Sequence, residues 1–188
     1  MSAHATPEQI HAKLDHPVID GDGHWIEYTP VFAEKIRKAV GDKGANGFLA
    51  SQRRIPDSLS LTPDERARRG VAMEGNWGRQ STNTRDRATA MMPTMLYDRL
   101  DELGLDFGII YPTAGLGIHR IADDATRQAV IRGFNIVTAD YFKGLEDRLT
   151  PAAVIPVHTP EEAIAELEFA TKQLGANVFI LLIFVRRT

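Results

Sequence analysis

The sequence predicts an α/β fold in which crossover helices join the strands of a parallel sheet. Four short apolar segments, at 17–19, 107–111, 150–157 and 177–184, have the length of strands, and segments with helical periodicity separate the later ones. Alternation of this kind is typical of parallel sheets. The four segments are apolar throughout instead of alternating with polar residues, which indicates a sheet covered on both faces.

Helix starts are marked by Thr-Pro pairs. Thr6-Pro7 and Thr159-Pro160 are each followed by Gln or Glu at the third helical position, the pattern of a capping box. Thr62-Pro63 repeats it, and Thr29-Pro30 is expected to open a helix that stops at Gly41. Further helices are predicted at 93–103, 124–145 and 160–174.

A long excursion follows the first predicted strand. Residues 41–92 are mostly polar and rich in Arg, Asn, Gly and Ser, with little periodicity of the kind that builds a core. In a compact domain such a stretch is usually a functional excursion or a mobile lid. We expect a lid-like or mobile insertion here, and the sequence leaves disorder open as the alternative.

Composition excludes several classes of protein. The chain has 188 residues, of which 43% are hydrophobic, and a net charge of −3, so nothing favours nucleic acid or an anionic membrane as partner. It has no Cys, so any metal site must use His, Asp or Glu. The N-terminus lacks an apolar signal core, and the longest apolar run, 178–185, is too short to span a bilayer. We therefore expect a cytoplasmic protein.

The most informative segment runs from Val18 to Glu27, where an apolar run ends in two Asp, two Gly and a His. Residues i and i+2 of a strand point the same way, so Asp22 and His24 are expected to project side by side. A carboxylate and an imidazole placed in this way make half of a divalent-metal site. The alternative is a polar turn that happens to contain a His.

Several segments together carry a family resemblance. They are 18–24 with Glu27, then 99–106, 111–113, 134–135, 148–156, 160–167 and 174–176. In this order and spacing the chain resembles the N-terminal half of the amidohydrolase-related, metal-dependent TIM-barrel proteins. The most similar branch includes aminocarboxymuconate-semialdehyde decarboxylase and resorcylate-type decarboxylases.

The resemblance implies a partial (β/α)₈ TIM barrel, with residues 1–188 as a single incomplete barrel domain and 41–92 as its insertion. A full barrel typically needs roughly 250 residues. The resemblance also implies that Asp22 and His24 bind a divalent metal, Zn²⁺ or Mn²⁺. In the family a further His and a carboxylate come from later strands, which lie beyond the fourth predicted strand. With two ligands the metal is expected to be weakly bound or absent.

The remaining candidates lie in segments that follow predicted strands. Tyr111 and Thr113 follow the second strand, His119 lies in its loop, and His158 follows the third strand. The carboxyl ends of barrel strands form the catalytic face, so all four are candidates for substrate binding. Glu27 is a candidate partner that orients His24. Each of these residues also has a purely structural alternative, as a packed strand end or a surface side chain. No catalytic residue is assigned.

Two functional hypotheses follow. The first is a metal-dependent hydrolase or decarboxylase of the amidohydrolase type that acts on a small carboxylated substrate, for which an aromatic acid is one candidate. The second is a non-catalytic, truncated homologue or an interaction module that associates through its exposed sheet edge. An apolar, uncharged edge at 178–184 favours association, so we expect a homo-oligomer. The sequence leaves open whether the 188-residue chain is itself an enzyme.

Overall fold

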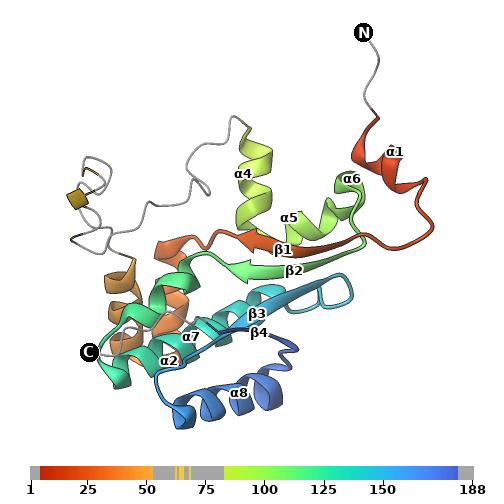
Figure 1. Cartoon of the computed structure of the whole chain (residues 1–188). Coiled ribbons are helices and arrows are strands. Elements are labelled where there is room, and N and C mark those ends of the chain that lie inside the picture. Colours follow the sequence, from red (N-terminus) through yellow and green to blue (C-terminus); the bar gives the residue numbers. More distant parts are fainter. Residues whose placement is uncertain (1–4, 53–61, 63, 66–67, 69–82, 182–188) are drawn as a thin grey trace.

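A four-stranded parallel sheet in the order β1-β2-β3-β4 forms the centre of the molecule (Figure 1). The computed structural model describes residues 5–52, 62, 64–65, 68 and 83–181. The strands are β1 (Ile19–Trp25), β2 (Phe107–Pro112), β3 (Leu149–Ile155) and β4 (Val178–Leu181). Sequential parallel strands with flanking helices make half of a barrel, so the predicted partial (β/α)₈ fold is confirmed.

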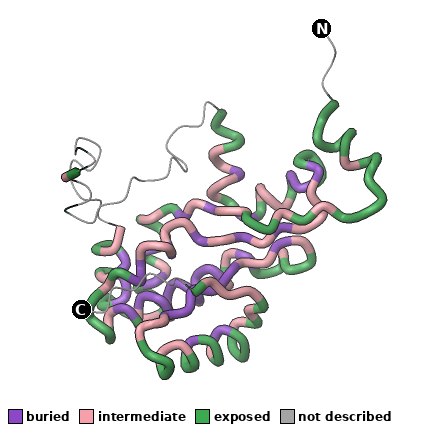
Figure 2. Tube along the Cα trace, viewed as in Figure 1, coloured by how far each residue is buried: buried purple, intermediate pink, exposed green. Residues whose placement is uncertain are grey.

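Helices flank the sheet and connect its strands. They are α1 (Pro7–His11), α2 (Thr29–Ser51), α4 (Thr84–Met91), α5 (Pro93–Asp98), α6 (Leu100–Leu103), the 3₁₀ helix η1 (Ala114–Arg120), α7 (Asp124–Phe142) and α8 (Pro160–Leu174). Figure 2 shows buried positions along α7 and the middle of the sheet, whereas α1 is exposed.

The predicted helix caps are present where the structure describes them. The Thr6 side chain accepts a hydrogen bond from the backbone of Gln9, whose side chain accepts one from the backbone of Thr6. Thr159 caps α8 by accepting from Glu162 N, and Gly175 ends this helix in the left-handed conformation. Thr62 and Glu65 make reciprocal bonds, but most of the helix predicted there lies outside the described residues.

Several predicted boundaries were wrong. The first strand begins at Ile19 and includes the Asp/Gly/His segment, which had been expected to follow it. The predicted helix at 93–103 is divided at Arg99 into α5 and α6, and α7 ends at Phe142 instead of continuing to 145.

The largest correction concerns residues 41–51. Gly41 has a positive φ of 82° and kinks α2, but the helix resumes and continues to Ser51. Ala45 and Phe48 in this second half are fully buried, so it belongs to the core and not to a polar lid. The predicted insertion ends in α4, and its residues 53–61, 63, 66–67 and 69–82 lie outside the described part of the chain.

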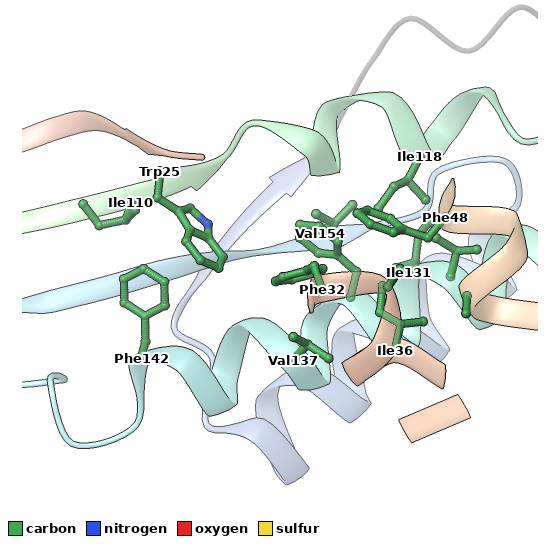
Figure 3. Close-up of a cluster of buried hydrophobic side chains, with 14 of the residues drawn as sticks. Trp25, Phe32, Ile36, Phe48, Ile110, Ile118, Ile131, Val137, Phe142 and Val154 are labelled. Carbon is green, nitrogen blue, oxygen red and sulfur yellow. The ribbon is translucent and has the colours of Figure 1, made fainter. Parts of the chain in front are cut away.

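Close approach of α2 and α7 explains why this half of α2 was hard to recognise. A Cβ placed on Gly47 would lie 2.5 Å from Thr126 Cγ2, and one on Gly133 would lie 2.6 Å from Val40 Cγ2. Small residues at these positions therefore let the two helices approach each other closely. Figure 3 shows the resulting core, where Phe48 lies with Phe32, Ile36 and Ile131.

The sheet opens between β2 and β3 towards its carboxyl end. Their pairing stops at Ile110 and Pro151. Beyond this point the side chain of Asn135 on α7 makes the backbone hydrogen bonds to β3 that a neighbouring strand would otherwise make. Its Nδ2 donates to Val154 O and its Oδ1 accepts from Val154 N, both at 2.9 Å. Nδ2 also donates to Glu166 of α8 at 2.8 Å. One buried amide thus joins β3, α7 and α8.

Candidate functional site

The strand ends of β1 and β2 bring four of the predicted residues together. His24 is in register with Tyr111, and the centroids of their rings lie 5.9 Å apart. Asp22 precedes His24 on β1, and Thr113 follows Tyr111 at the end of β2. The structure therefore assembles this group of candidates at the carboxyl edge of the sheet, where barrel proteins place their sites.

Asp22 and His24 lie on the same side of β1. His24 Nε2 and Asp22 Oδ1 are 3.9 Å apart, with the Asp22 side chain 94% exposed and that of His24 21% exposed. The register with β2 shifts between Asp20 and Gly23, a bulge that the sequence analysis missed. Its signal was the pair of glycines inside a strand. Asp20 holds the bulge by accepting a hydrogen bond from Asp22 N at 3.0 Å.

The distance between Asp22 and His24 is compatible with a shared metal ion. A carboxylate oxygen and an imidazole nitrogen each lie about 2.0–2.2 Å from a bound ion, so two such ligands can be up to roughly 4 Å apart. Rotation of the exposed Asp22 side chain is enough to bring the angle at the ion towards tetrahedral or octahedral values. Among the described residues, however, no group of three or more His, Cys, Asp or Glu could hold a metal ion.

The other ring nitrogen of His24 faces Thr113. Nδ1 and Thr113 Oγ1 lie 3.4 Å apart, a long hydrogen bond whose direction depends on the tautomer of the ring. Thr113 was predicted as a substrate-binding residue. The structure places it beside a predicted metal ligand, where it can orient the imidazole, and its contact with substrate stays a prediction.

Glu27 lies beyond β1 and is 5% exposed. Its Oε2 accepts a hydrogen bond of 2.8 Å from Ala114 N, the first residue of η1, and its Oε1 is buried without a partner. Burial raises the pKa of Glu27 to about 7, although backbone hydrogen bonds, chiefly from Ala114, oppose this shift. We expected Glu27 to orient His24 directly, but its hydrogen bond goes to the loop that carries Thr113.

His119 and His158 lie apart from this group, near the amino ends of α7 and α8. His119 is 7% exposed, and both its ring nitrogens are buried without hydrogen-bond partners. Burial lowers its pKa to about 4, helped by the charges of His158 and Arg127. Burial also lowers the pKa of His158, whose Nδ1 is buried without a partner. Because its ring is enclosed, we leave His119 out of the proposed site, and its contact with substrate stays a prediction.

Replacing His119 with leucine should stabilise the protein by about 1 kcal/mol at pH 7, because two unpaired buried nitrogens are removed. The gain should increase as the pH falls from about 6.5 towards 4. In this range the unfolded wild-type chain binds a proton that the folded chain, with its lowered His119 pKa, does not bind. Urea unfolding of both proteins at several pH values measures this. A leucine variant less stable than wild type at pH 5 would contradict it, and the exposed His16→Leu is the control.

A cavity of about 270 Å³ adjoins His24 on the side of α4 to α6. Its other lining residues are Asp86, Thr89, Ala90, Leu96, Arg99 and Leu103. The Arg99 side chain is 10% exposed and is fully engaged, because its guanidinium donates to Asp86, Thr89 and Glu102. The cavity therefore has both polar and apolar walls, and the Arg99 guanidinium in its lining is already hydrogen-bonded within the protein.

Comparison with solved structures shows which proteins share the fold. A manganese-bound 5-carboxyvanillate decarboxylase from Novosphingobium aromaticivorans aligns with a TM-score of 0.51 and 16% identity over 89% of this chain. A 2,6-dihydroxybenzoate decarboxylase aligns with a TM-score of 0.53 and 15% identity over 92%. An amidohydrolase from Mycobacterium avium subsp. paratuberculosis aligns with a TM-score of 0.57 and 16% identity over 88%.

These similarities show the fold that the sequence analysis predicted. This chain covers 42%, 40% and 49% of those three proteins, so it spans less than half the length of each. No family model and no curated protein matches the sequence. In the part of the chain that the structure describes, no helix has the length and apolar character needed to cross a membrane.

Proposed function

We propose that this chain carries two metal ligands, Asp22 and His24, of a metal-dependent hydrolase or decarboxylase of the amidohydrolase type. The observation that carries the proposal is the 3.9 Å approach of Asp22 Oδ1 to His24 Nε2 at the carboxyl end of β1. Support comes from the fold, which is shared with a decarboxylase that binds manganese. The remaining ligands would come from later strands, as in the family that the sequence resembles.

The substrate that we propose is a small carboxylated aromatic compound. When bound, a divalent ion supplies Lewis-acid polarisation of a carboxylate or carbonyl and can lower the pKa of a water molecule. The chain's own contribution is to hold the ligands and to offer a surface for the substrate. Tyr111 beside His24 can stack on an aromatic ring, and the lining of the cavity next to His24 includes the apolar side chains of Leu96 and Leu103. His158, at the carboxyl end of β3, remains a predicted substrate contact.

Metal binding by single variants tests this proposal. Equilibrium dialysis at increasing Mn²⁺ concentration should show weak binding of about one ion per chain for the wild type, because the chain itself supplies two ligands, and at least a tenfold weaker affinity for Asp22→Ala and His24→Ala, because each removes one of them. The matched controls are Asp15→Ala and His16→Ala, which change the same residue types at exposed positions outside the site. Equal affinity of all five proteins, or no binding by the wild type, would contradict the proposal.

If the ion is retained, release of CO₂ from 2,6-dihydroxybenzoate distinguishes decarboxylation from hydrolysis. This compound is the ligand of one of the similar structures. Release that depends on Mn²⁺ and is lost in His24→Ala would support decarboxylation. Hydrolysis of an aromatic ester or lactone with the same dependence would favour the hydrolase alternative.

A further inference from the structure

Two hydrogen bonds join the end of β2 to β1 and its following loop. Glu27 Oε2 accepts from Ala114 N at 2.8 Å, and Thr113 Oγ1 lies 3.4 Å from His24 Nδ1. Thr113 and Ala114 are consecutive residues at the start of η1. The turn that Glu27 holds is therefore the same turn that places the Thr113 hydroxyl beside His24.

The orientation of His24 matters because an imidazole binds a metal through a nitrogen that carries no proton. In metal sites the other nitrogen commonly donates its N–H to an oxygen, which selects the tautomer and the direction of the ring. In this chain Nε2 is the nitrogen near Asp22, and Nδ1 is the nitrogen near Thr113. If Nδ1 donates its proton to Thr113 Oγ1, then Nε2, which lies 3.9 Å from Asp22 Oδ1, carries a lone pair and no proton.

Glu27 is placed to hold this turn in position. The residue before η1, Thr113, makes no side-chain cap to the helix, so its first N–H groups need an acceptor from elsewhere. The buried Glu27 carboxyl supplies one from the loop after β1, across the gap between two chain segments 87 residues apart. Burial of a carboxyl costs free energy, so its presence here calls for a role, and holding this turn supplies one.

We propose that Glu27 and Thr113 act together as positioning residues for His24, with Glu27 fixing the turn and Thr113 selecting the tautomer in which Nδ1 carries the proton and Nε2 does not. The value of this arrangement to metal binding rests on the proposed function. The hydrogen bonds themselves need no metal, so they can be tested in the metal-free protein.

Long-range ¹H–¹⁵N NMR of the histidine rings at pH 8, without metal, reports the tautomer of His24. We expect protonation on Nδ1 in the wild type. Thr113→Val keeps the shape of the side chain but removes the hydroxyl, so the ring should shift towards the Nε2–H tautomer. Glu27→Ala should cause a similar shift, whereas Glu27→Gln, which keeps an acceptor for Ala114 N, should preserve the wild-type signal. Thr171→Val, at an exposed hydroxyl of α8, is the control.

The outcomes separate this inference from the proposed function. An Nδ1–H tautomer that persists in both Thr113→Val and Glu27→Ala overturns the positioning role, whether or not metal binds. If Glu27→Ala fails to fold, Thr113→Val alone decides. A tautomer that changes as expected in a protein that binds no Mn²⁺ supports the positioning role and contradicts the proposed function. If metal does bind, Thr113→Val should weaken its affinity about 10- to 100-fold.

Discussion

Replacing Asn135 with alanine should lower the free energy of unfolding by about 4 kcal/mol, the largest effect that we expect from a single polar substitution. Asn135 is 2% exposed, and its amide is the partner of both Val154 N and Val154 O. Truncation would leave these two buried backbone groups unpaired, and each costs about 1–3 kcal/mol. Glu166, which is 5% exposed, would also lose one of its hydrogen-bond partners.

Urea unfolding measures this effect, since the whole stability of a domain is about 5–15 kcal/mol and a loss of this size remains measurable in most cases. The matched control is Asp140→Ala on the same helix, where an exposed carboxylate pairs with Lys35. An exposed ion pair contributes at most about 1 kcal/mol, so the control should remain close to wild type. A loss below about 1.5 kcal/mol for Asn135→Ala would show that β3 does not depend on this amide.

Replacing Glu27 with glutamine should make the protein about 3 kcal/mol more stable than wild type at pH 8, while the two should be nearly equal at pH 4.5. The pKa of Glu27 is raised by burial from 4.5 to about 7 in the folded protein. At about 1.4 kcal/mol for each pKa unit, this difference corresponds to roughly 3 kcal/mol. Glutamine cannot ionise, and its carbonyl can still accept the hydrogen bond from Ala114 N.

The sign follows from proton binding. Between pH 4.5 and about 7 the folded wild type keeps the proton on Glu27, whereas the unfolded chain has released it, so wild-type stability falls as the pH rises through this range. Above pH 7 the difference is constant. The comparison of the two proteins at each pH removes the opposite contribution of His119. Thermal or urea unfolding from pH 4.5 to 8 should therefore show that the difference in free energy of unfolding between Glu27→Gln and wild type increases with pH.

The exposed Glu34→Gln is the control for this series. Its carboxyl hydrogen-bonds to Lys38, which lowers the pKa of Glu34, so its contribution has the opposite sign and lies at lower pH. The difference in free energy of unfolding between Glu27→Gln and wild type could instead stay constant from pH 4.5 to 8. That result would show that Glu27 is ionised in the folded protein over this whole range, contrary to its burial.

Local signals predicted the main elements because they depend on neighbouring residues alone. Thr159-Pro160 and Gly175 mark the two ends of α8, and the structure begins and ends that helix there. The apolar segments predicted β2, β3 and β4 and their parallel order. The boundaries that failed are those set by distant contacts. Gly41 looked like a helix end, but Phe48 beyond it packs against Phe32 and Phe134, which stabilises a second helical segment.

The candidate site divides in the same way. The spacing of Asp22 and His24 on one strand was enough to predict that their side chains lie together. The partners of that pair were not predictable, because Thr113 lies 89 residues from His24 in the chain and Ala114 contributes only a backbone N–H. Nor does the sequence distinguish the enclosed ring of His119 from an exposed one in the same loop.

The sequence by itself therefore determined the alternation of strands and helices, the parallel sheet and the pairing of Asp22 with His24, since strand periodicity and helix caps act within a few residues, whereas the half-barrel was implied by the family resemblance. Only the tertiary structure decided that the Asn135 side chain hydrogen-bonds to the backbone of β3, that the Glu27 carboxyl accepts from the first N–H of η1, and that Thr113 lies beside His24. The physical reason is that burial and hydrogen bonding between segments far apart in the chain depend on how the helices pack against the sheet, which no local pattern encodes.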